Sequence, residues 1–139
     1  MVSEHEIAIR VNYHEVDGQG RVHNSQYLNY FERGRVEMLR ASGISYREVE
    51  QSGLMLVVRS MHVDFHMPAV FDDELTLKTR LGYCHGARIE HHYRIVRRVK
   101  GMDGEEALLV TGKSEIGCID LTGRAKRLPP YLQLNLRGE

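Results

Sequence analysis

The chain has 139 residues, of which 42% are hydrophobic and 27% charged, and its formal net charge at pH 7 is zero. This length fits one domain with a substantial core and is too short for two independent cores. The composition is that of an ordinary soluble globular protein, and the balanced charge argues against nucleic acid or an acidic membrane surface as a partner.

The N-terminus and the cysteines indicate the cellular setting. The first ten residues, MVSEHEIAIR, contain charges and no apolar run, so no signal peptide is predicted. No stretch approaches the roughly 18 apolar residues of a membrane span. Cys84 and Cys118 are isolated and lack CxxC spacing, which indicates two reduced structural thiols and neither a disulfide framework nor a zinc site. We expect a single cytoplasmic, soluble domain over residues 1–139.

The first predicted elements are a strand and a long helix. Residues 7–13 alternate between apolar and polar or small side chains, which predicts a half-buried strand. After a glycine-containing loop, apolar residues recur at helical spacing and predict a helix over residues 25–42. Asn24 or Ser25 can cap its N-terminus, and Gly43 supplies the C-terminal stop. A helix of this length needs a broad apolar surface to rest on.

The remainder of the chain has mainly strand patterns. A short helical turn is predicted at 45–51, and β-branched or alternating segments then predict strands over 54–66, 75–83, 89–95 and 107–121. The segment KGMDGE at 100–105 predicts a hairpin turn. One helix lying against one curved antiparallel sheet of about five strands is the simplest α+β fold for this order. The edge of such a sheet and its second face need cover, so we expect a homo-oligomer.

The loop between the first strand and the helix contains a candidate catalytic carboxylate. Asp17 is followed by glycines at 18 and 20, which allow a tight turn and the close approach of a substrate. The helix N-terminus that follows exposes unpaired N–H groups, which can stabilise an oxyanion. A carboxylate beside such a site suits hydrolysis of a thioester, whose thiolate leaves without a strong acid. The alternative is that Asp17 serves only the chemistry of the turn.

Two sequence blocks resemble one known family. The first contains Asp17, Gly20, Val22, Tyr27 and the segment FERGR at 31–35. The second is VVRSMHVDFHMPAVFDDELTLKTRL at 57–81, and the tail RAKRLP follows at 124–129. These blocks resemble the hotdog-fold acyl-CoA thioesterases of the 4-hydroxybenzoyl-CoA thioesterase family, most closely the branch associated with the Tol–Pal envelope system. The resemblance covers nearly the whole chain, and its strength lies in the order and spacing of the blocks.

The resemblance implies a fold, an assembly and a site. A hotdog fold wraps its sheet around the long helix, its dimers join edge to edge, and its tetramers pair two dimers, with active sites at the dimer interface. By this resemblance Asp17 is the nucleophile or general base, and the backbone N–H of Asn24 polarises the thioester carbonyl. His23 and Tyr27 line the site, and Gly20 lets the substrate approach. The substrate is an acyl-CoA, and no cofactor or metal is implied.

Three positions depart from the family pattern. Many relatives carry Asp two residues before the catalytic carboxylate, where this chain has Glu15. The family often has an aromatic residue or Asn in place of His23, and an apolar residue or His in place of Arg21. These differences leave the role of Asp17 standing and bear on which acyl group is preferred.

Basic and histidine-rich segments offer further candidate sites. The phosphates of coenzyme A need cationic partners, and the alternative for these side chains is a solvated surface; the candidates are Arg88, Arg124, Lys126 and Arg127. On a strand, His62, Asp64 and His66 share one face and could in principle bind a metal, although a polar surface strip is the simpler interpretation. His91 and His92 point to opposite faces and cannot chelate together.

Three alternatives to an acyl-CoA thioesterase remain open at this stage. The carrier could be acyl carrier protein in place of coenzyme A. A hotdog hydratase could use Asp17 and His23 as its acid and base, although the motifs of that class are not present. A non-catalytic module that binds acyl thioesters is the third. No helix-turn-helix segment is available for binding DNA.

Overall fold

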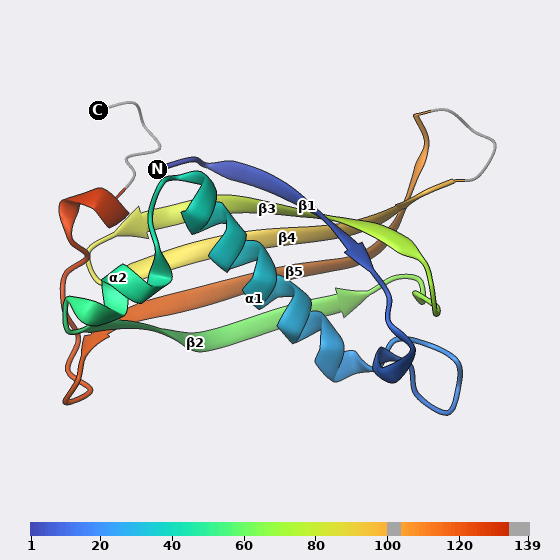
Figure 1. Cartoon of the computed structure of the whole chain (residues 1–139), viewed down its shortest axis with the longest axis horizontal. Helices are drawn as coiled ribbons and strands as arrows, with labels where there is room; N and C mark the ends of the chain where they lie inside the picture. Colours follow the sequence, from blue (N-terminus) through green and yellow to red (C-terminus); the bar gives the residue numbers. More distant parts are fainter. Residues whose placement is uncertain (100–103, 134–139) are drawn as a thin grey trace.

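The computed structural model describes residues 1–99 and 104–133, which form a five-stranded antiparallel sheet with a long helix across one face (Figure 1). The strand order is β1-β3-β4-β5-β2, so β1 and β2 are the two edges. The elements in chain order are β1 (Glu4–Arg10), η1 (Tyr13–Glu15), α1 (Asn24–Ala41), α2 (Tyr46–Gln51), β2 (Leu54–Phe65), β3 (Glu74–His85), β4 (Arg88–Arg98), β5 (Glu106–Asp120) and η2 (Pro130–Leu132). The predicted α+β architecture is confirmed.

The prediction for the first strand was wrong at both ends. β1 begins at Glu4 and ends at Arg10, because its polar first residues pair in register with β3, where Glu4 faces Arg80 and Glu6 faces Lys78. Residues 13–15 form the 3₁₀ helix η1 instead of continuing the strand. The other predicted strands and both helices are confirmed to within a few residues. Residues 100–103 of the predicted hairpin turn lie outside the described residues.

The ends of α1 are set by two different residue types. The predicted cap, Asn24 or Ser25, was wrong: the N-cap is His23, whose side chain accepts a hydrogen bond from the backbone N–H of Ser25. At the other end Gly43 has φ +78°, a conformation that glycine adopts without strain, and it stops the helix as predicted.

Close contact between α1 and the sheet defines the core. A Cβ atom on Gly34 would lie 2.5 Å from Thr79 Oγ1, so only glycine lets the helix approach β3 this closely. Phe31 stacks on Tyr93 with ring centroids 4.2 Å apart, and the missing side chain of Gly112 makes room for the Phe31 ring. The core divides into a cluster around Phe31 and a second cluster that contains Met38 and both cysteine thiols. In the described part of the chain, no helix combines the length and apolar character needed to cross a membrane.

A buried histidine lies beneath the C-terminal half of α1. A cavity of about 80 Å³ separates this part of the helix from the inner faces of the strands, and its lining includes Arg35 and His91 among mainly apolar side chains. His91 is only 6% exposed, and its Nδ1 has no hydrogen-bond partner among the described residues. Burial, together with the nearby charge of Arg35, lowers the pKa of His91 to about 3.

The buried His91 predicts a pH dependence of stability. The unfolded chain protonates this histidine below about pH 6.5, whereas the folded chain keeps it neutral down to about pH 3. The unfolded state therefore binds the additional proton, and the free energy of unfolding decreases as the pH falls through this window, by at most about 1.4 kcal/mol per pH unit. Urea unfolding of wild type and His91→Gln between pH 7 and pH 4 should show a smaller slope in the variant.

His92→Gln is the matched control for this measurement. His92 follows His91 on β4 but lies on the opposite face of the sheet, where its Nε2 is 2.6 Å from Glu90 Oε1. Equal slopes in wild type and His91→Gln would show that His91 does not contribute the predicted term.

Candidate active site

Asp17 lies in a small hairpin-like loop that leads directly into α1. Val16 and Val22 form an antiparallel bridge at the base of this loop. Above it the N–H of Asp17 donates to the carbonyl of Arg21 at 2.8 Å, and the N–H of Gly20 donates to the carbonyl of Asp17 at 3.0 Å. Gly20 has φ +77°, so this tight turn needs the glycine. The loop is therefore an ordered structure that fixes the backbone of Asp17.

The carboxylate of Asp17 contributes to the same turn. Its Oδ1 accepts the N–H of Gln19 at 2.8 Å, with the N–H of Arg21 at 3.5 Å. Such an Asx turn is what the purely structural interpretation predicted. Only one of the two carboxylate oxygens is used, and Oδ2 has no protein partner within residues 1–99 and 104–133. The turn thus orients the carboxylate and leaves one oxygen available.

The N-terminus of α1 presents an unpaired donor. The ring nitrogen Nδ1 of His23 accepts the N–H of Ser25 at 3.2 Å, and the carbonyl of His23 accepts the N–H of Gln26 at 2.9 Å. Asn24 is the first helical residue, where the backbone N–H has no intrahelical partner.

A shallow depression of about 170 Å³ lies beside this helix terminus. It is lined by Asn24 and Tyr27 from α1, by Arg21 and Val22 from the loop, and by residues 65–68 at the end of β2 and just after it. Asp17 and His23 do not line the depression. The structure therefore brings together two of the four predicted catalytic residues, Asn24 and Tyr27, and places Asp17 and His23 on the adjoining loop.

The wall of the depression is held by an ion pair that the sequence patterns did not single out. Arg97 Nη1 on β4 is 2.7 Å from Asp73 Oδ2, and the same oxygen accepts the N–H of Val70 at 3.0 Å. Arg97 also approaches the carbonyl of Pro68 at 3.4 Å. These contacts tie the segment 66–73 to the sheet. The Asp72-Asp73 pair of the family motif was the available signal, but its basic partner lies 24 residues further along the chain.

Two tyrosines connect the depression to the interior. Tyr27 contacts Phe65 on one side and Tyr30 on the other, with ring centroids 5.4 Å and 5.8 Å apart. Burial raises the pKa of both tyrosines above the ordinary value; for Tyr30 the charge of Glu15 adds to the effect. Both hydroxyls therefore remain protonated at neutral pH.

The predicted phosphate-binding residues lie at the opposite end of the sheet from Asp17. Arg88 begins β4 and Arg97 is near its end; β4 has 11 residues, which separates the two ends by roughly 30 Å. The tail is tied to the Arg88 end, because the N–H of Leu128 donates to the carbonyl of Gly86 at 2.6 Å. Arg88 is 2.9 Å from Glu115 Oε1, and Lys126 is 3.9 Å from Asp120 Oδ2. Within one chain, these cations and Asp17 do not form a single site.

The histidine strip on β2 does not assemble a metal site. His62 Nε2 lies 3.0 Å from Asp64 Oδ2, whereas His66 Nε2 faces Thr111 Oγ1 at 3.0 Å. Among the described residues no group of three His, Cys, Asp or Glu side chains has the proximity needed to hold a metal ion.

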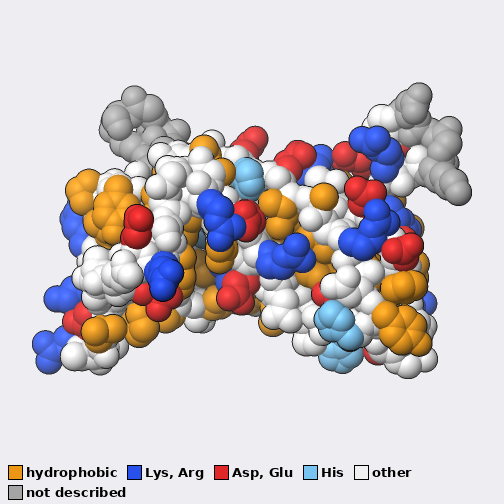
Figure 2. Space-filling model, in the orientation of Figure 1, with side chains coloured by type: hydrophobic (Ala, Val, Ile, Leu, Met, Phe, Trp, Pro, Cys, Tyr) orange, Lys and Arg blue, Asp and Glu red, His pale blue; other side chains and the backbone are white. Residues whose placement is uncertain are grey.

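Figure 2 shows charged side chains of both signs interspersed over the face that carries α1.

Comparison with known proteins identifies the family. A family model described as the thioesterase-like superfamily matches residues 11–136. The chain belongs to the thioesterase-like superfamily. The chain is 31% identical over 122 residues to the acyl-CoA thioester hydrolase YbgC of Escherichia coli, covering 87% of each chain. The resemblance found in the sequence is thereby confirmed.

Solved structures support the same assignment. The chain superimposes on a probable thioesterase from Bartonella henselae with a TM-score of 0.80 and 38% identity, covering 91% of this chain and 100% of that chain. A mutant 4-hydroxybenzoyl CoA thioesterase complexed with 4-hydroxybenzoyl CoA gives a TM-score of 0.85 at 18% identity, covering 94% of this chain and 96% of that chain. At this identity the second match shows the fold alone, which is the hotdog fold of the superfamily.

The cap of α1 gives a test of local structure that is independent of chemistry. His23→Ala removes the side-chain acceptor for the Ser25 N–H and should lower the free energy of unfolding by about 1 kcal/mol. His23→Asn, which supplies another good N-cap, should be close to wild type. Urea unfolding of the three proteins measures both effects, and equal stability of His23→Ala and wild type would contradict the capping role.

Proposed function

We propose that this member of the thioesterase-like superfamily hydrolyses the thioester of an acyl-CoA to a free acid and coenzyme A. The observation that carries the proposal is the direct connection of an oriented carboxylate to an open helix N-terminus. Asp17 is held by its loop with one oxygen available, and the loop enters α1 at Asn24, a residue that lines the depression. The name of the related E. coli protein, an acyl-CoA thioester hydrolase, supports this reaction.

In the proposed reaction the substrate carbonyl oxygen accepts the N–H of Asn24. The partial positive charge of the helix terminus then stabilises the oxyanion that forms. Asp17 either removes a proton from the attacking water or attacks the carbonyl itself to give an anhydride, which water then opens. In both routes the C–S bond breaks and coenzyme A departs as a thiolate. Tyr27 borders the acyl group in the depression, His23 lies next to it at the helix terminus, Gly20 admits the substrate, and the reaction needs no metal or cofactor.

The position of the cations favours a site shared between two copies of the chain. β2 is an edge strand, and its Val58 and Phe65 are 49% and 53% exposed. Antiparallel pairing of β2 with the β2 strand of a second copy would bring the Asp17 end of one copy beside the Lys126 and Arg127 end of the other. We therefore propose a homodimer, which can pair further into a tetramer. In this dimer Arg88 and the basic tail of one copy bind the phosphates of the coenzyme A whose thioester lies at Asp17 of the other copy.

The direct test of the reaction is free-thiol release from a panel of short, long and aromatic acyl-CoAs. Wild type should turn over at least one class, and Asp17→Asn should lose most of kcat while it keeps the wild-type melting temperature, because the amide can still accept in the turn but cannot act as base or nucleophile. Turnover by Asp17→Asn at the wild-type rate would exclude the mechanism. Thiol release from acyl-acyl carrier protein but not from acyl-CoA would show that acyl carrier protein is the carrier. Loss of the double bond of an enoyl-CoA would indicate a hydratase.

Mixed oligomers test whether the site is shared. Asp17→Asn and the double variant Lys126→Glu/Arg127→Glu should each be impaired on acyl-CoA. Co-expression of the two chains with different tags should restore activity to about a quarter of wild type, since half of randomly paired dimers contain one intact site out of two. Activity that stays at the level of the separate variants would place the cations and Asp17 in independent locations.

A further inference from the structure

Glu15, two residues before Asp17, is the one carboxylate classed as buried among the described residues, with 7% of its surface exposed. No cation forms an ion pair with it in that part of the chain. Instead its Oε1 accepts two hydrogen bonds, from the backbone N–H of Asn12 at 2.7 Å and from the hydroxyl of Tyr30 at 3.0 Å. A buried polar oxygen whose partners are two donors depends strongly on each of those donors.

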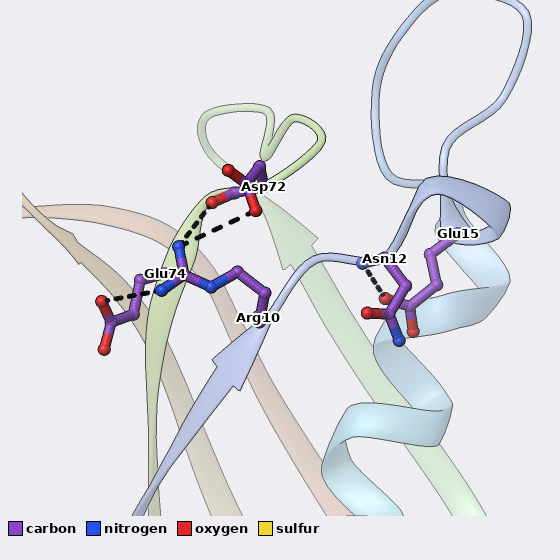
Figure 3. A network of polar contacts seen from close by, with 5 residues as sticks. All are labelled: Arg10, Asn12, Glu15, Asp72 and Glu74. Carbon is purple, nitrogen blue, oxygen red and sulfur yellow. Dashed lines mark hydrogen bonds and ion pairs between the residues drawn. The ribbon is translucent and has the colours of Figure 1, made fainter.

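The two bonds join three segments of the fold. Asn12 precedes η1, Glu15 ends it, and Tyr30 lies on the second turn of α1. Figure 3 shows the contact between Asn12 and Glu15 beside the start of α1. The same view contains the Arg10 contacts with Asp72 and Glu74, but those side chains are more than half exposed and such surface pairs contribute little.

Glu15 also closes the base of the loop that carries Asp17. Its backbone carbonyl accepts the N–H of His23, the cap residue of α1, at 2.9 Å. The bridge between Val16 and Val22 follows immediately above. The main chain of Glu15 thus fixes the two ends of the loop to each other, and its side chain fixes that base to the helix through Tyr30.

We infer that Glu15 is a positioning residue, whose carboxylate holds the Asp17 loop against α1 and so sets the Asp17 carboxylate relative to the Asn24 N–H. This inference rests on the proposed function. A carboxylate suits the position because it only accepts, and both groups that face its Oε1 are donors. Gln would keep one oxygen that can accept both bonds, whereas Leu, of similar size, has no acceptor for either donor.

The catalytic test uses Glu15→Leu, Tyr30→Phe and their double variant, with the acyl-CoA that wild type turns over fastest. Both single variants should lower kcat by about 10- to 100-fold while KM changes by less than about twofold, because displacing reacting groups costs rate more than binding. The double variant should be no slower than the more impaired single variant, since both remove the same contact.

Tyr93→Phe is the matched control. Tyr93 is also a buried tyrosine under α1, in the middle of β4, and its hydroxyl lies 2.5 Å from Ser114 Oγ and makes no contact with Glu15. Its loss should lower the melting temperature to an extent similar to Tyr30→Phe and leave kcat unchanged. If Tyr93→Phe lost as much kcat as Tyr30→Phe, both losses would be explained by general destabilisation, and the inference would be overturned.

Amide hydrogen exchange gives a readout that does not depend on activity. Exchange in the peptide covering residues 12–23 should accelerate in Glu15→Leu and Tyr30→Phe and remain at the wild-type rate in Tyr93→Phe. If wild type releases no thiol from any acyl-CoA, the proposed reaction fails. Faster exchange in the Glu15 and Tyr30 variants would still show that the Glu15 side chain holds the Asp17 loop against α1. Folded Glu15→Leu and Tyr30→Phe proteins that keep the wild-type kcat would overturn the positioning role, whatever their exchange rates.

Discussion

The seating of α1 on the sheet is the constraint on which the remaining structure depends. Gly34 allows the helix backbone to reach the surface of β3, and Gly112 opens the space on β5 that the ring of Phe31 fills. Packing at this density fixes the helix in translation and rotation, because neither contact tolerates a shift without a clash or a void. The N-terminus of α1, with its unpaired N–H groups, is therefore held at one place on the sheet. A rigid element of this kind is what a site for a developing negative charge requires.

The loop before α1 places the Asp17 carboxylate next to the fixed N-terminus of the helix, and together they form the candidate site. Its base is closed by backbone bonds, and its internal turn uses one oxygen of Asp17. The structural and the catalytic interpretations of Asp17 are therefore compatible, since the same turn that consumes Oδ1 orients Oδ2. Glu15 connects this small unit to the interior at Tyr30.

The Asp17 loop and the cationic residues lie far apart within one chain. They are at opposite ends of β4, and β2 forms an edge of the described sheet. An edge strand with partly exposed apolar side chains favours pairing with another strand. A two-fold axis at that edge is the simple way to bring the two ends together, and it would produce two equivalent sites from one interface.

The sequence by itself determined the type and order of the elements, the long helix, the α+β class and the family, because alternation, helical spacing and motif order are local properties of the chain. It also singled out Asp17 and Asn24. The cap at His23, the 3₁₀ turn at Tyr13, the Arg97–Asp73 pair and the burial of Glu15 were decided only by the tertiary structure. Each depends on side chains that meet across the fold or compete for the same backbone donor, and such contacts leave no periodic signal in the sequence.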